Sequence, residues 1–419
     1  MTQSQLVSEL ELPSFDSTDP SIRGDRFHEV MRGLSAQGWL AKDPFGYVVL
    51  DRESAEFFLR TRSAIFPGMK IAEIFGVTEG PLYEQMKRNI LHVNGPDHTR
   101  LRSLVNPALS PRAVERYRPE MSGFMQELLD QASASAGSDG VVRCDFVEAF
   151  AKPYPSLVIA SVMGAPLEDA PKLHHWSNWI QRQFDAGSMA SEREGIERAV
   201  DEFYGYAESL LRTRRQSPGD DLISKLIAAE EEGERLSDVE CINLVFNVLV
   251  GGVDTSQSQL AHAIRLLAEH PAQWAQLQQD PSLAAGAVEE ALRYEPITPF
   301  TARILTEEIS YRDVTFPQDT IVMVCAFTGN RDLGSEERGQ NGADRFDIAA
   351  ASDGGGARAL TFGAGVHYCL GANLARLELQ EGLAFLAERL KDLELDGEPE
   401  FGTISGIYGL DKLPVRFSV

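Results

Sequence analysis

The sequence predicts a mainly α-helical fold with small β ribbons, formed by a single large domain over residues 1–419. Apolar residues recur at helical spacing over much of the chain, whereas strand-like runs are few and short. Loop-forming stretches such as 133–140 (SASAGSDG) are too short to link separate domains. The hydrophobic content of 43% is ample for one large core.

The clearest early helical pattern lies at 114–128, where apolar residues share one helix face: Val114, Tyr117, Met121, Phe124, Met125 and Leu128. The strand-like runs are Gly46–Leu50, Ile321–Val324 and Val415–Val419. They are short and widely separated, so we expect small ribbons and no large sheet.

One helix is expected to cross the centre of the molecule. Ser237 and Glu240 have the spacing of a capping box, and the helical pattern then continues to His270, before Pro271. The run 242–250 (INLVFNVLV) is apolar almost all round, which predicts a fully buried segment.

The run 251–256 (GGVDTS) follows inside the same helix. Each of its two glycines costs about 1 kcal/mol relative to alanine in a helix, so a buried helix needs a reason to keep them. Small residues let a flat group pack on the backbone, or let a turn widen. The ordinary alternative is that Thr255 bonds back to a carbonyl group and Asp254 pairs with a basic side chain.

Composition excludes some classes of function. Acidic residues number 63 and basic residues 39, for a net charge of −24. Nucleic-acid binding normally needs a basic face, so we do not expect it as the main role. The four cysteines are scattered, which favours a reducing, cytoplasmic compartment: Cys144, Cys241, Cys325 and Cys369. The polar N-terminus resembles no signal peptide, and the apolar run Val245–Val250 is too short to span a membrane.

The most informative motif is FGAGVHYCLG at 362–371. Its glycines allow a tight turn close to a flat group, and the helix-like run after Cys369 places the sulfur near a helix N-terminus, where a thiolate is favoured. Such a thiolate suits a fifth ligand to haem iron, although a lone cysteine is more often structural. With six fixed positions in ten residues, the motif resembles the haem-binding loop of the cytochrome P-450 family of haem-thiolate monooxygenases.

This resemblance, which covers most of the chain, implies the cytochrome P-450 fold, haem b as the cofactor and Cys369 as the axial ligand of its iron. The central helix would cross over the haem. Asp254 and Thr255 match the acid–alcohol motif of the family, so Thr255 is expected to hold a water and Asp254 to relay protons from solvent.

A Glu290–Arg293 pair lies one helical turn apart, a spacing that usually gives a surface salt bridge worth about 0.3 kcal/mol. The resemblance implies a structural role instead, in which the pair ties its helix to the segment before the haem loop. That segment would begin at 330–332, and the stretch from Leu333 onward departs from the family pattern.

The resemblance also implies cations for the two haem propionates. His98 and Arg102 lie four apart after Pro96 and match the P-x-H-x-x-x-R segment of the family. Arg303 and His367 are the third and fourth candidates, although Arg303 taken alone could be an ordinary surface charge.

Candidates for the substrate pocket are mainly apolar: Val248, Gly251, Ile297, Phe300 and Ile407. They indicate a fairly apolar small organic molecule, although the same residues could simply be core.

The expected reaction inserts one oxygen atom of O₂ into a C–H bond. Two electrons would come from NAD(P)H through a separate ferredoxin or similar donor with its reductase, because no further domain is expected in this chain. The donor is expected to dock on the Cys369 side, on Arg100, Arg112 and Arg376. Oxidative coupling, desaturation or ring formation is the alternative reaction. A haem sensing or recruitment module is a third possibility, which the Asp254–Thr255 pair argues against.

Overall fold

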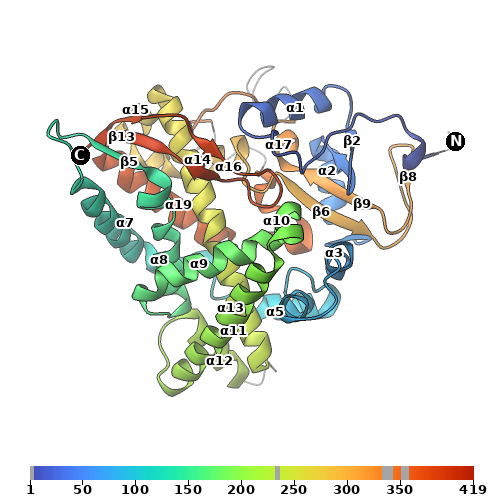
Figure 1. Ribbon diagram of the computed structural model, residues 1–419, viewed down its shortest axis with the longest axis horizontal. Coiled ribbons are helices and arrows are strands. Elements are labelled where there is room, and N and C mark those ends of the chain that lie inside the picture. Colours follow the sequence, from blue (N-terminus) through green and yellow to red (C-terminus); the bar gives the residue numbers. More distant parts are fainter. Residues whose placement is uncertain (1–3, 232–235, 333–342, 351–357) are drawn as a thin grey trace.

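The structure is a computed structural model that describes residues 4–231, 236–332, 343–350 and 358–419. The segment at 333–342, where the sequence departs from the family pattern, lies outside the described residues. Helices dominate, as predicted (Figure 1). Their bounds are α1 Asp25–Ser35, α2 Arg52–Arg60, α3 Met69–Ile74, α4 Pro81–Arg88, α5 Gly95–Val105, α6 Pro111–Val114, α7 Arg118–Ser133, α8 Pro153–Met163, α9 Ala170–Gln181, α10 Ala186–Ser191, α11 Arg193–Gln216, α12 Leu222–Glu231, α13 Asp238–Gly252, α14 Asp254–Glu269, α15 Pro271–Gln279, α16 Ala284–Tyr294, α17 Ala326–Gly329 and α19 Ala372–Arg389.

The strands are short and form small sheets. Their bounds are β1 Gln5–Leu6, β2 Leu40–Asp43, β3 Gly46–Val49, β4 Ala64–Ile65, β5 Val142–Asp145, β6 Phe300–Leu305, β7 Ile309–Tyr311, β8 Val314–Phe316, β9 Ile321–Cys325, β10 Lys391–Leu395, β11 Glu400–Phe401, β12 Leu410–Lys412 and β13 Pro414–Ser418. The largest sheet has the order β2-β3-β9-β6-β4, and smaller ones join β1-β8-β7, β10-β13-β5 and β11-β12. The three predicted strands are confirmed as β3, β9 and β13.

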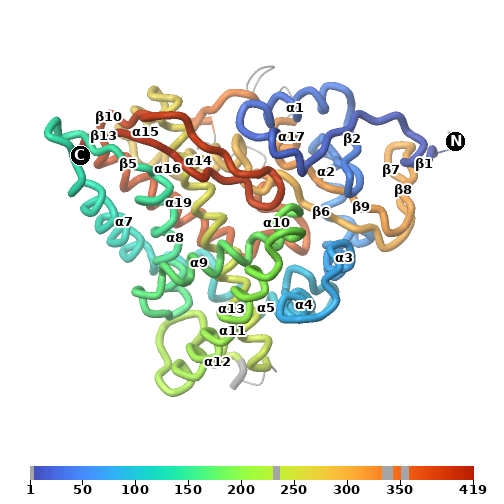
Figure 2. Tube along the Cα trace, in the orientation of Figure 1, coloured from blue at the N-terminus to red at the C-terminus, as the bar shows by residue number. Residues whose placement is uncertain are grey.

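The elements form two regions. Figure 1 shows the five-stranded sheet with α1 and α2 on one side of the molecule and the long helices α7, α8, α9, α11 and α19 on the other. The tube in Figure 2 shows β1 and β13 at opposite ends. Strand pairs still join distant parts of the chain, because β13 pairs with β5 and β9 pairs with β3.

The helical pattern at 114–128 is confirmed as a buried face, but it is shared between elements. Val114 ends α6, a short 3₁₀ turn covers Glu115–Tyr117, and α7 begins at Arg118. The apolar residues of the pattern are all buried in the main core.

The predicted central helix is confirmed in position and corrected in shape. Ser237 caps it with the expected capping box to Glu240, and all but one residue of 242–250 are buried. It is not one regular helix, however, because α13 ends at Gly252 and α14 begins at Asp254. The Thr255 hydroxyl donates to the Gly251 carbonyl at 2.6 Å. Two glycines and a side chain that bonds the backbone explain the irregular turn at Val253.

Within the described residues, the stretch Asp238–Glu269 is long and apolar enough to cross a membrane, with a mean hydropathy of 1.2. The prediction that no run here is long enough is therefore wrong by that measure. The apolar 18-residue window that meets this measure is 67% buried inside the protein, as in the core helix of a globular protein. It packs against α8, α9, α16 and α19.

Candidate active site

Cys369 lies in a tight loop that leads into α19. Its N–H donates to the Phe362 carbonyl at 2.9 Å, which closes the loop. Gly363 and Gly365 have φ of 69° and 73°, which favour glycine, and a Cβ on Gly365 would lie 2.4 Å from the Leu59 carbonyl oxygen. The glycine pattern of the motif therefore serves this turn and its close approach to α2.

The surroundings of the Cys369 thiol suit a ligand. Burial raises its pKa, and the backbone N–H groups of Gly371 and Ala372 at the start of α19 act in the opposite direction. The residue nevertheless keeps accessible surface, unlike the fully buried Cys325. The thiol is thus deep in the protein, beside the N–H groups of a helix start and in a residue that is not fully covered, and this position fits the predicted ligand.

The four predicted cations converge on one another. The rings of His98 and His367 lie 4.3 Å apart, and Arg102 donates to the carbonyl of Tyr368, next to Cys369. Arg303 is only 2% exposed, so the alternative of a surface charge is wrong for it. Its guanidinium donates to the Ala302 carbonyl at 2.9 Å.

This cluster contains no acid. Within the described part of the chain, none of the four forms an ion pair with a carboxylate, whereas most other arginines do. Burial lowers the pKa of Arg303 to about 10. Burial, followed by the charges of His98, Arg303 and Arg102, lowers the pKa of His367 to about 3. Buried donors without an anion are costly, so the site fits a group that carries two carboxylates, such as haem.

The central helix is left uncovered at Gly251 and Thr255. Both keep accessible surface, although the residues just before and after them are mostly buried. A Cβ added at Gly251 would meet no atom within 4 Å, whereas one at Gly252 would lie 2.4 Å from Cδ1 of Ile159. Open space above a helix glycine is what a flat cofactor with a small ligand needs.

Asp254 is buried and points away from this space, toward α9. The Ser177 hydroxyl donates to its Oδ2, and the Asn178 amide donates to its Oδ1 at 3.3 Å. The alternative that Asp254 pairs with a basic side chain is excluded for lysine and arginine among the described residues, whereas the charge of His174 does act on the Asp254 carboxyl group and lowers its pKa. The other alternative is confirmed, because Thr255 does bond back to a carbonyl group.

The Glu290–Arg293 pair is fully internal. Two bonds of 2.8 and 2.9 Å join the side chains, which are 0% and 5% exposed, so the alternative of a surface salt bridge is wrong. Arg293 also donates to the carbonyls of Ala343 and Arg345, and Glu290 accepts from the N–H of Asp347. The pair thus holds the described segment 343–347, as the resemblance implies.

The substrate candidates do not all lie together. Val248 and Gly251 lie on α13, and Ile297 joins the segment of Ile407 because its carbonyl accepts from the N–H of Tyr408 at 2.8 Å. The Phe300 ring packs on Phe15 and Phe27, in the core cluster that also holds Tyr408. That placement favours the core alternative for Phe300.

Two of the three arginines predicted to receive the electron donor are already paired. Arg100 pairs with Glu240, and Arg376 pairs with Glu289 and lies over the ring of Phe362. Arg112 is exposed and forms no ion pair within the described residues. Of the three predicted arginines, only Arg112 therefore offers an unpaired charge to an electron donor within the described structure.

The sequence interpretation missed several buried polar residues around the site. His174, Ser177 and Asn178 on α9 were not considered, nor was Glu378 on α19, whose carboxylate accepts from Ser256 at 2.9 Å. A signal was present for the first group, since polar residues at positions i, i+3 and i+4 share one helix face.

Comparisons with known proteins agree with this geometry. A family model described as Cytochrome P450 matches residues 47–285 and 274–399. Luteothin monooxygenase of Streptomyces thioluteus is 34% identical over 408 residues, which cover 97% of this chain and 96% of the relative. Cytochrome P450 107B1 of Saccharopolyspora erythraea is 36% identical over 430 residues, covering 97% of this chain and 98% of the relative.

Solved structures give the same result. CalO2 has a TM-score of 0.87 at 30% identity and covers 97% of this chain and 99% of its own. P450BioI, in complex with an acyl carrier protein that carries hexadec-9Z-enoic acid, has a TM-score of 0.82 at 28% identity, with coverage of 94% and 99%. The chain therefore belongs to the cytochrome P450 family and is a haem monooxygenase.

Proposed function

We propose that this protein inserts one atom of O₂ into a C–H bond of a fairly apolar small molecule, with Cys369 as the thiolate ligand of haem b. The observation that carries the assignment is the buried Cys369 thiol beside the N–H groups at the start of α19, in a residue that is not fully covered. The propionates would be bound by His98, Arg102, Arg303 and His367. None of these four side chains forms an ion pair with a carboxylate within the described residues.

The haem supplies the oxygen chemistry, because a thiolate ligand favours cleavage of the O–O bond. The residues of this chain supply position and protons. The proton of the Thr255 hydroxyl is donated to Gly251, so its oxygen is left to accept a bond from a water in the open space. Asp254, one residue earlier, would pass protons toward that water.

A spectrum tests the ligand assignment. The reduced carbon-monoxide complex of the wild type should show the red-shifted Soret band of thiolate ligation, and Cys369→Ala should lose it. Cys144→Ala, at a partly covered cysteine on β5, is the matched control and should keep the band. A red-shifted band in Cys369→Ala would overturn the assignment.

Val248, Gly251, Ile297 and Ile407 are proposed to line the substrate site, with Phe300 in a supporting position. Relatives that act on secondary metabolites, such as luteothin monooxygenase and erythromycin C-12 hydroxylase, support such a substrate class. A screen of apolar candidates for a Soret shift on binding, followed by product analysis, separates hydroxylation from coupling, desaturation or ring formation.

The electrons are proposed to come from a ferredoxin or similar protein with its reductase, docking on the face of the Cys369 loop. Val366 in that loop is 72% exposed, Arg60 of α2 lies beside the loop at Gly365, and the exposed Arg112 lies on α6, which packs against α19. We also propose that residues 1–419 form one domain, which the β1–β8 and β5–β13 pairings support. The scattered cysteines support a second proposal, that the protein works in the cytoplasm.

A further inference from the structure

A polar strip runs along the face of α9 that packs against the central helix. His174 Nε2 lies 3.0 Å from Oε1 of Gln257, Ser177 and Asn178 bond Asp254, and Gln181 donates to the carbonyl of Val250. These positions share one face of α9, because they are spaced by three, four and seven residues. Figure 1 shows α9 lying across α13 and α14.

Asp254 occupies the middle of this strip without a lysine or arginine partner. It is 5% exposed, and burial raises the pKa of its carboxyl group, while Ser177, His174 and Asn178 act in the opposite direction. A buried carboxylate held only by neutral donors is costly in its charged form. The ionisation of Asp254 is therefore sensitive to any charge that faces it.

His174 is the ionisable group whose charge acts on Asp254, from the α9 face that also carries Ser177 and Asn178. It is half-buried, and its Nε2 bond to Gln257 fixes the ring beside α14. Helix α8 brings no charged side chain. Several charged groups on α9 and on the elements packed against it have other partners: Glu202 with Trp176, Asp169 with Lys172 and Tyr206, Arg182 with Glu192, Arg265 with Glu295, and His262 with the carbonyl of Tyr408. Others are exposed, such as His175 on α9 and Arg198 and Asp201 on α11. Asp238 and Glu240 lie in the first turn of α13.

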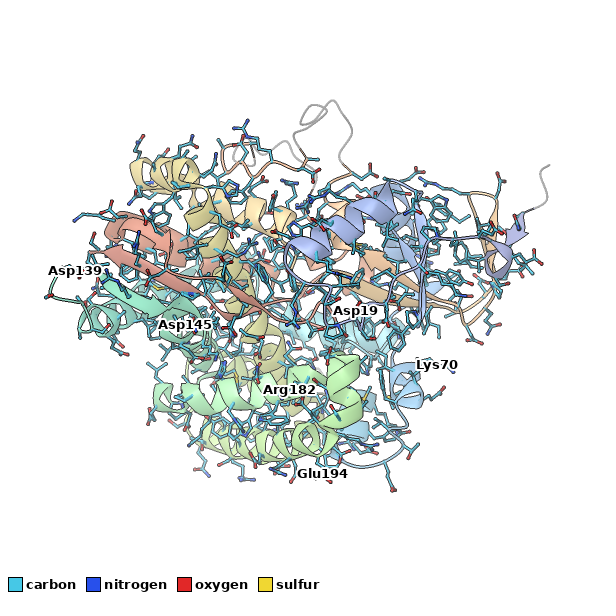
Figure 3. The ribbon with its side chains drawn as sticks, turned by 45° about the horizontal axis from the view of Figure 1, so that its top comes forward. Asp19, Lys70, Asp139, Asp145, Arg182 and Glu194 are labelled. Carbon is cyan, nitrogen blue, oxygen red and sulfur yellow. The ribbon has the colours of Figure 1, made fainter. Side chains whose placement is uncertain are left out.

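We propose that Asp254 and His174 share one proton and that His174 reloads Asp254 from solvent after each proton transfer to the active site. This rests on the proposed function, in which Asp254 delivers protons. Ser177 and Asn178 act as positioning residues that hold the carboxylate between α9 and the site. Figure 3 labels Arg182, which continues the strip beyond Asn178 and bonds its amide oxygen.

The proton balance is simple. Asp254 gives its proton to the water held near Thr255 and becomes a carboxylate. The neutral imidazole of His174 then takes one proton from solvent and gives it to that carboxylate, directly or through a water. The pair returns to its starting state, with one proton passed inward and one taken up.

A measurement on the resting, haem-loaded protein tests the shared proton. The infrared carbonyl band of a protonated carboxyl group, identified by its loss in Asp254→Asn, is followed as pH is stepped. In His174→Gln, which keeps a donor to Gln257 but carries no charge, the band should persist to a higher pH than in wild type. His175→Gln, at the exposed neighbour on α9, should titrate like wild type. An unmoved midpoint in His174→Gln would overturn the proposal.

Turnover gives the second readout. His174→Gln should lose about tenfold in product formation and show a larger solvent isotope effect, because solvent then reloads Asp254 only slowly. If Asp254→Asn leaves product per NAD(P)H unchanged, the proposed proton role of Asp254 itself is wrong. If Asp254→Asn uncouples turnover while His174→Gln matches His175→Gln in both readouts, only the present proposal fails.

Discussion

The Thr255 hydroxyl can accept a hydrogen bond but has no proton left to donate. Its proton is donated to the Gly251 carbonyl at 2.6 Å, so only the oxygen lone pairs remain to face the accessible side of the helix. Replacing Thr255 by alanine should leave the haem spectrum and substrate binding intact. It should lower the product formed per NAD(P)H consumed and raise peroxide release, because a water is no longer held near the reacting oxygen.

Thr255→Ser is the matched variant, since it keeps the hydroxyl and its bond to Gly251. Coupling should stay close to the wild-type value there. Equal coupling in wild type and Thr255→Ala would show that protons arrive by another route, such as a hydroxyl group of the substrate.

Glu378 is a buried acid whose ionisation should appear in the stability of the protein. Burial raises its pKa from 4.5 to about 8, and the bond from Ser256 opposes that shift only in part. Its Oε1 has no hydrogen-bond partner within the described structure. The folded state therefore binds a proton that the unfolded state releases between about pH 4.5 and 8. The stability that the folded protein gains from binding this proton is fully present below that window and is lost as pH rises through it.

The free energy of unfolding should consequently fall with rising pH by up to about 1.4 kcal/mol per pH unit in that window. Glu378→Gln keeps a partner for Ser256 and should remove this part of the slope. Urea unfolding at pH 5 and pH 8 measures it, with the exposed Glu388→Gln on the same helix as control. Equal slopes in wild type and Glu378→Gln would contradict the prediction.

At the scale of an element, the two glycines at the end of α13 have different reasons to be there. The space above Gly251 is open, whereas a Cβ at Gly252 would collide with Ile159 of α8. Gly251→Ala should fold well and gain up to about 1 kcal/mol from helix propensity, yet weaken binding of substrates that fill this space. Gly252→Ala should lose about 1–3 kcal/mol through overpacking.

Thermal unfolding and substrate-induced Soret shifts separate the two variants, and each serves as the control for the other. A stable Gly252→Ala together with an unchanged substrate affinity in Gly251→Ala would show that neither glycine has the role given to it.

The sequence predicted the elements well where a local signal exists. The capping box at Ser237 and the apolar run 242–250 place the start and the burial of the central helix, because both depend on neighbouring residues alone. The break at Val253 was not predicted. Helix propensity shows that glycines weaken a helix, but not whether packing against other helices will keep the turn regular. The division of the pattern at 114–128 between α6 and α7 was missed for a similar reason.

The candidate site divides in the same way. Cys369 and its loop could be predicted because the motif is local, and the four cations because they match family segments. The partners of Asp254 could not, since α9 lies about 80 positions away from it and a pairing between helices is set by packing. The role of Phe300 could not be decided from the sequence, because an apolar residue near the site in sequence fits the core equally well.

At the scale of the whole molecule, a net charge of −24 should repel an acidic electron donor over long distances. Association then depends on a local positive surface on the Cys369 side, for which we take the exposed Arg112 on α6, a helix that packs against α19. Arg100 and Arg376 contribute less than expected from the sequence, because each is paired with a glutamate.

Electron transfer from an acidic ferredoxin should therefore slow as ionic strength rises, since salt screens this local attraction. Arg112→Glu should slow the association step several-fold at low salt, in stopped-flow reduction under carbon monoxide, and leave the haem spectrum unchanged. Arg416→Glu makes the same change of charge at an exposed residue of β13, far from the loop, and should have little effect. If both variants slow reduction equally, net charge alone governs the encounter, and the donor does not dock on the Cys369 face through Arg112.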